Sequence, residues 1–151
     1  IYLGAFDFTY NAHNWVARGN ADYGYVSDAK TISAIRKPGT QYVKPYESNQ
    51  VFGSHAIATS IEVGYDIFSQ IPKLRQDNKK LYVFGHYEYY DSYVNAPSKK
   101  WTNRNIFAAG VNYYPIPQIA IKAEYNYRKL KSGYNDEPAV NIGIAYQGFF
   151  L

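Results

Sequence analysis

The chain has 151 residues and a net charge of +4, and it contains neither cysteine nor methionine. This length suits one domain, and no shift in composition divides residues 1–151, so we expect a single structural unit. The basic residues are scattered and form no recognisable RNA-binding motif, which argues against a nucleic-acid partner. No apolar run approaches the about 18 residues of a transmembrane helix, but a membrane β-barrel would escape that test because only alternate residues face lipid.

Apolar and polar side chains alternate along seven stretches, which predicts about seven β-strands. The stretches cover residues 2–10, 15–26, 53–68, 81–93, 104–114, 119–129 and 139–150. Pro115 and Pro117 stand between the fifth and the sixth stretch. Because proline cannot donate to a sheet ladder, these two residues predict a tight turn at residues 114–118.

The connections between the predicted strands alternate in length. Tight or middle-length connections (residues 11–14, 69–80 and 114–118) alternate with mostly longer ones (residues 27–52, 94–103 and 131–138). In an up-and-down meander, alternate connections emerge on the same side, and outer-membrane barrels have short turns on one side and longer loops on the other. We therefore expect an all-β fold, an antiparallel up-and-down transmembrane β-barrel in a bacterial outer membrane.

The apolar face of the predicted strands carries aromatic residues toward both strand ends, with aliphatic and small residues between them. Toward the tight turns these are Tyr10, Trp15, Tyr65, Tyr113, Tyr146 and Phe150, and toward the long loops Tyr2, Tyr23, Tyr25, Tyr87, Tyr89, Tyr125 and Tyr127. Two aromatic girdles around an aliphatic waist suit a bilayer, because amphipathic rings settle at the headgroup level. The alternative is a soluble β-barrel or sandwich that would bury the same face as its core.

The segments NIGIAYQGFF (residues 141–150) and GVNYYPIPQIAIKAEY (residues 110–125) resemble the C-terminal portion of an outer-membrane porin of the phosphate-selective-porin-like type found in Bacteroidota. The resemblance implies a closing strand near the C-terminus and a larger, even-stranded barrel, of which this chain is the C-terminal part. A single missed strand would instead give a closed barrel of eight. As partners the resemblance implies lipid, lipopolysaccharide, small solutes or anions, and other outer-membrane chains or further copies in a trimer.

The polar face would line the lumen of such a barrel and tune its selectivity. Acidic residues on this face are at least as numerous as basic ones. Our candidate pore-lining residues on the strands are Arg18, Glu88, Lys122, Glu124 and Arg128. We expect Lys122 and Arg128 to join a network with Glu124 and with acids of neighbouring strands.

The longest connection adds Arg36, Lys37 and Lys44 as candidate selectivity residues. If this loop folds into the lumen, its bases would form an electropositive constriction; otherwise it is a solvated loop that contacts lipopolysaccharide or nothing specific. The function favoured by the sequence is a porin for passive diffusion of small hydrophilic or anionic solutes. The alternative is a small closed barrel that serves as a structural or docking subunit of a membrane complex.

An enzymatic function receives little support. His86 and Glu88, two residues apart on one face, are the only candidate acid–base pair, and no G-x-S-x-G nucleophile motif is present. Neither metal-ligand spacing nor a glycine-rich phosphate loop occurs, so we expect no cofactor.

Overall fold

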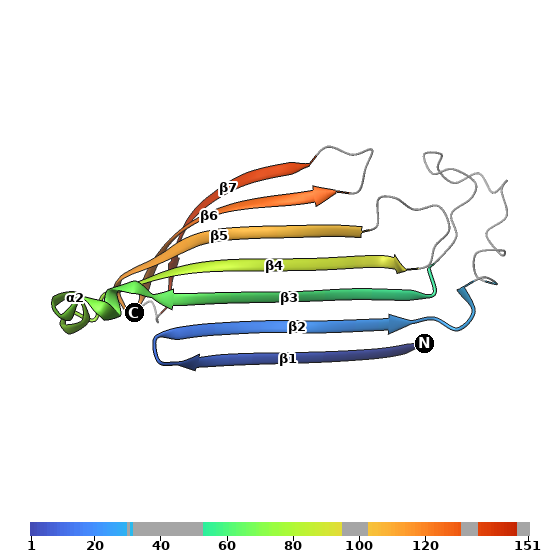
Figure 1. Ribbon diagram of the computed structural model, residues 1–151, viewed down its shortest axis with the longest axis horizontal. Coiled ribbons are helices and arrows are strands. Elements are labelled where there is room, and N and C mark those ends of the chain that lie inside the picture. Colours follow the sequence, from blue (N-terminus) through green and yellow to red (C-terminus); the bar gives the residue numbers. More distant parts are fainter. Residues whose placement is uncertain (30, 32–52, 95–102, 131–135, 148–151) are drawn as a thin grey trace.

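The computed structural model describes residues 1–29, 31, 53–94, 103–130 and 136–147. Within these ranges, seven strands form one sheet in chain order, and each strand pairs antiparallel with the next (Figure 1). The strands are β1 (Tyr2–Ala12), β2 (Trp15–Tyr25), β3 (His55–Asp66), β4 (Lys80–Val94), β5 (Asn103–Ile116), β6 (Ile119–Leu130) and β7 (Glu137–Tyr146). The predicted all-β, antiparallel up-and-down architecture is therefore confirmed. The sheet is open, with β1 and β7 at its two edges.

Two short helices separate β3 from β4: the 3₁₀ helix η1 (Ile67–Gln70) and the α-helix α2 (Pro72–Gln76). The prediction that the third strand runs to residue 68 is therefore wrong. The reason is Asp66, whose carboxylate accepts hydrogen bonds from the backbone N–H of Phe68 at 3.1 Å and of Leu81 at 3.0 Å. This side chain ends β3 and ties the start of β4 to it, and it is 5% exposed.

The tight turns owe their shape to particular residues. His13 and Asn14 join β1 to β2 with φ angles of 54° and 66°, the positive values required by the two-residue hairpin turn that matches strand twist. At the other tight turn, β5 continues through Pro115 to Ile116, so the connection is shorter than predicted. The pairing with β6 shifts register between Tyr113 and Ile116, and a proline is tolerated at such an irregularity near a strand end.

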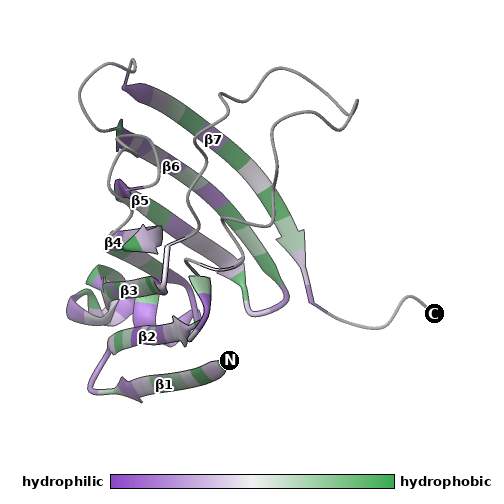
Figure 2. Cartoon of the chain, turned by 90° about the vertical axis from the view of Figure 1, so that its right-hand side faces the viewer, coloured by the Kyte–Doolittle hydropathy of each residue, from purple (hydrophilic) through white to green (hydrophobic). Residues whose placement is uncertain are grey.

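The register gives the sheet one apolar and one polar face. Val63, Gly85, Ala109 and Tyr125 are successive cross-strand partners from β3 to β6, and all belong to the alternating apolar set. The sheet curves across its strands, and hydrophobic and hydrophilic residues alternate along them (Figure 2). We call the face that carries Val63 the apolar face and the opposite one the polar face.

The apolar face has no second layer packed against it among the described residues. On the edge strand β7, Val140, Ile142 and Ile144 are 69%, 79% and 77% exposed. Phe107, Ile121 and Tyr125, on the interior strands β5 and β6, are exposed as well. In the described ranges the only buried residues are Ala29, Asp66, Phe84, Ala120 and the glycines Gly19 and Gly64. An exposed apolar surface of this extent is typical of a face that contacts another protein or a membrane.

In the part of the chain that the structure describes, no helix is long and apolar enough to cross a membrane.

Candidate functional site

The predicted strand-borne pore residues lie on the polar face. Glu88 of β4 and Arg128 of β6 share one cross-strand row through Ile106 of β5. Arg18 lies two residues from Asn20, which joins the same row through Ser60. Lys122 and Glu124 are an even number of residues from Arg128, and successive side chains of a strand alternate between faces, so they share its face. Arg36, Lys37 and Lys44 lie outside the described residues.

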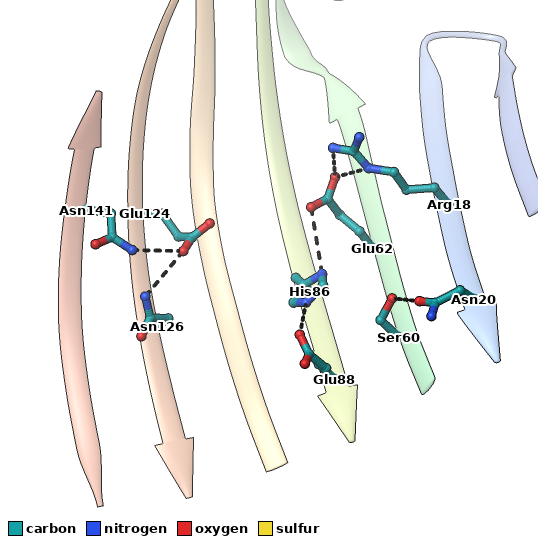
Figure 3. A network of polar contacts seen from close by, with 9 residues as sticks. All are labelled: Arg18, Asn20, Ser60, Glu62, His86, Glu88, Glu124, Asn126 and Asn141. Atoms are coloured by element: carbon teal, nitrogen blue, oxygen red, sulfur yellow. Dashed lines mark hydrogen bonds and ion pairs between the residues drawn. The ribbon is translucent and has the colours of Figure 1, made fainter. Parts of the chain in front are cut away.

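A chain of charged side chains crosses the polar face from β2 to β4 (Figure 3). Arg18 donates from Nε and Nη2 to Oε1 of Glu62, at 2.8 and 2.5 Å. His86 lies between two carboxylates, with Nδ1 3.8 Å from Oε2 of Glu62 and Nε2 3.6 Å from Oε2 of Glu88. Both distances exceed hydrogen-bond length, so His86 makes no hydrogen bond to either carboxylate.

A second polar group occupies β6 and β7. Arg128 Nη1 lies 2.6 Å from Glu137 Oε2, and Glu124 accepts hydrogen bonds from Asn126 and Asn141 at 3.4 and 3.3 Å. The predicted network between Arg128 and an acid of a neighbouring strand therefore exists, but the acid is Glu137. Glu124 pairs with amides instead, because four residues along one strand span about 13 Å.

Lys122 makes no ion pair with any residue in the described ranges, so the network predicted for it is not found there. Its side chain is exposed, and its cross-strand neighbours are Asn112 and Gly143. Neither neighbour carries a charge. Among the described residues, Lys122 thus has no carboxylate within ion-pair distance, whereas Arg18 and Arg128 are each paired with one.

The polar face is hollowed at its tight-turn end by a cavity of about 470 Å³. Its apolar part comes from Val16, Tyr82, Phe84 and Tyr114. The rings of Tyr82 and Tyr114 meet edge to face, with centroids 6.0 Å apart. Phe84 is 8% exposed, and this burial makes it a fixed part of the cavity wall.

Sequence reasoning missed these aromatic residues as part of the polar face. Tyr82 and Phe84 precede His86 and Glu88 at intervals of two, so strand alternation alone would have placed them there. They were overlooked because residues were assigned to a face by the polarity of the side chain and not by their odd or even position along the strand. The polar face is therefore mixed at one end, where aromatic rings replace charges.

An enzyme that used His86 as a base would need a nucleophile beside it, and no hydroxyl group among the described residues is hydrogen-bonded to His86. The hydroxyl of Ser60, on the same face, donates to the side-chain oxygen of Asn20. The described ranges also contain no group of three or more His, Asp or Glu residues arranged to hold a metal ion. In the described ranges this face consists of paired charges, amides and rings.

The connection between β6 and β7 contains a carboxylate with a perturbed pKa. Asp136 accepts hydrogen bonds from the hydroxyl of Tyr127 and, at 3.1 Å, from the backbone N–H of Leu130. The bond from Tyr127, helped by the Leu130 amide, lowers the pKa of Asp136 below its ordinary value of 3.8. This carboxylate therefore stays ionised and holds the end of β6 to the start of β7.

Comparison with curated proteins shows similarity to a distant relative. The chain is 29% identical over 141 residues to an uncharacterized protein of Aquifex aeolicus (strain VF5). The match covers 91% of this chain but only 30% of the relative's length. No protein-family model matches the chain, and no solved structure matches it.

Proposed function

We propose that this chain is the C-terminal part of an outer-membrane β-barrel porin, through which small hydrophilic or anionic solutes diffuse passively. The observation that carries the proposal is the division of one sheet into an exposed apolar face and a charged polar face. Hydrocarbon would cover Phe107, Ile121 and Ile142, while water in a lumen would solvate Arg18, Glu88 and Lys122.

The open sheet supports a larger barrel. Edge strands leave unpaired N–H and C=O groups, which cannot persist in lipid because no water is present to satisfy them. The outer edges of β1 and β7 therefore require further strands, from the same barrel or from another chain. The match covers only 30% of the relative from Aquifex aeolicus, so that protein is long enough to contain such strands.

The lumen would be lined by side chains of both signs. In the described ranges, the pairs Arg18–Glu62 and Arg128–Glu137 are neutral overall, while Lys122, Glu88 and Glu124 have no Lys, Arg or carboxylate partner of opposite charge within 4 Å. Two acidic side chains, Glu62 and Glu88, lie beside His86 on the same wall. A wall of this kind discriminates weakly among ions, which fits a diffusion pore better than a dedicated transporter.

A docking role is the second candidate, and the open edges favour it. If another chain, rather than more of the same barrel, pairs with β1 or β7, this sheet would be a structural part of a membrane assembly. A plugged lumen would then carry no ions.

The experiment is a conductance measurement on the intact protein, purified from its native membrane and inserted into a planar lipid bilayer. Stepwise conductance increases at salt concentrations near 1 M are the expected result. Insertion without conductance, shown by protease protection of the barrel in vesicles, would remove the porin function and leave the docking role.

A further inference from the structure

The cavity on the polar face combines aromatic surface with amide groups that have no hydrogen-bond partner among the described residues. Asn11, Asn78 and Asn112 line it from β1, from the connection before β4 and from β5. None of their side chains makes a hydrogen bond to any residue in the described ranges. Each carboxamide offers two donor hydrogens and an acceptor oxygen, so the cavity wall presents unused groups of both kinds.

The aromatic rings of the cavity add a different type of contact. Tyr82 and Tyr114 stand edge to face, and beside them Phe84 lies against the backbone of β3 and β5. That close approach requires glycines, because a Cβ at Gly110 would lie 2.9 Å from Cζ of Phe84. A tyrosine presents an apolar ring and a polar tip, so a ligand with both C–H and O–H groups suits this wall.

The charges of the cavity disfavour an anion. Arg18 and Glu62 both line it, but they pair with each other at 2.5 Å, so their charges cancel. Lys80 is the remaining cation of the lining, so an anion in the cavity would meet a single unpaired positive charge. A bound phosphate or carboxylate normally needs several converging cations or N–H donors.

We propose that this cavity is a binding subsite for a neutral polyhydroxylated solute, such as an oligosaccharide, within the lumen of the proposed porin. A sugar ring has an apolar C–H face, which packs on aromatic rings. It also carries hydroxyl groups, which both donate and accept hydrogen bonds. The cavity volume of about 470 Å³ falls within the roughly 300–1,000 Å³ of small-molecule pockets. This inference rests on the proposed function, since it assumes that solutes reach the polar face.

The test is calorimetric titration of the detergent-solubilised intact protein with maltotriose and, separately, with inorganic phosphate. We expect maltotriose to bind and phosphate to show no heat of binding. Tyr82→Leu should raise the Kd for maltotriose about tenfold, by removing ring contact and a hydrogen-bonding hydroxyl. The matched control is Tyr90→Leu, because Tyr90 lies on the same face of the same strand, outside the cavity and beside Arg104.

Asn112→Ala is a second variant, which removes an amide but no core packing. It should also raise the Kd for maltotriose, because it removes hydrogen-bonding groups from the cavity wall. Equal affinities for the Tyr82→Leu and Tyr90→Leu proteins, or no binding of maltotriose at all, would overturn the proposal. Phosphate binding that Lys80→Gln abolishes would overturn it in favour of an anion site.

Calorimetry does not depend on conduction, so the two proposals fail separately. A protein that conducts ions but does not bind maltotriose would remain a porin and lose this subsite. A protein that binds maltotriose without conducting would keep the subsite but lose the porin function.

Discussion

Arg18 and Glu62 face each other across the β2–β3 pair, and two guanidinium nitrogens of Arg18 donate to one carboxylate oxygen of Glu62. The side chain of Arg18 is nevertheless 62% exposed, and that of Glu62 is 21% exposed. A pair so open to solvent gains little from Coulomb attraction, because water screens it. The interaction energy of the pair therefore indicates whether the polar face is in contact with water.

We expect the coupling energy between Arg18 and Glu62 to be below about 1 kcal/mol. It is measured with a double-mutant cycle of Arg18→Gln and Glu62→Gln, from urea unfolding in detergent micelles. A coupling above about 2 kcal/mol would mean that the pair is shielded from water, which contradicts a water-filled lumen.

Gly110→Ala should destabilise the sheet by about 1–3 kcal/mol, because the new methyl group would press on the Phe84 ring and on the backbone of β6. Gly85→Ala is the matched control, since a Cβ at Gly85 meets no atom within 4 Å. Both free energies of unfolding come from the same urea titration. A loss in the Gly85 variant equal to that of Gly110 would show that the cost comes from backbone preference, not from crowding.

Lys122→Gln should lower the anion/cation permeability ratio by roughly twofold, because it removes one unpaired charge from a screened aqueous wall. The double variant Arg128→Gln/Glu137→Gln removes a charge of each sign and should leave the ratio unchanged. Reversal potentials in a salt gradient give both values. A larger effect of the double variant would mean that Arg128 and Glu137 act on ions separately, against the pairing at 2.6 Å.

The lowered pKa of Asp136, in the β6–β7 connection, makes the stability of the protein depend on pH. Its pKa is lowered in the folded protein, so its contribution to stability is fully present above the ordinary value of 3.8 and is lost as the pH falls through the folded value. Asp136→Asn should therefore reduce stability at pH 6, and the difference from the unmodified protein should vanish in strong acid. Thermal unfolding at several pH values measures it. A difference that grows below pH 3.8 would have the wrong sign for this interaction.

The strand number and order were predictable because a period of two is a strong signal when one face is apolar, as in Ile121, Lys122, Ala123 and Glu124. The short helices between β3 and β4 were not, since five residues of α2 cannot display a helical period. Their position depends on the Asp66 carboxylate, which gathers N–H groups from residues 68 and 81.

The partners of the charged residues were predictable only in part. Alternation places Arg128 and Glu124 on one face, but cross-strand register decides that Glu137 lies opposite Arg128. Register depends on turn geometry, and composition does not reveal it, as the irregularity in the β5–β6 pairing near Pro115 illustrates. The faces of the cavity residues Tyr82 and Phe84 were predictable from alternation, but the cavity itself was not, because it is assembled from β1 to β5 and their connections.

The central claim is that one face of this sheet contacts lipid and the other contacts water. The chain contains no cysteine, so single cysteines can be placed along β6 at Ile121, Lys122, Ala123 and Glu124 and modified with a nitroxide spin label. In the intact protein in lipid vesicles, labels at 121 and 123 should collide mainly with oxygen, which dissolves in lipid. Labels at 122 and 124 should collide mainly with a water-soluble nickel complex. Labels at 121 and 123 that are shielded from both reagents would show a buried protein core instead, and the membrane-barrel account would be wrong.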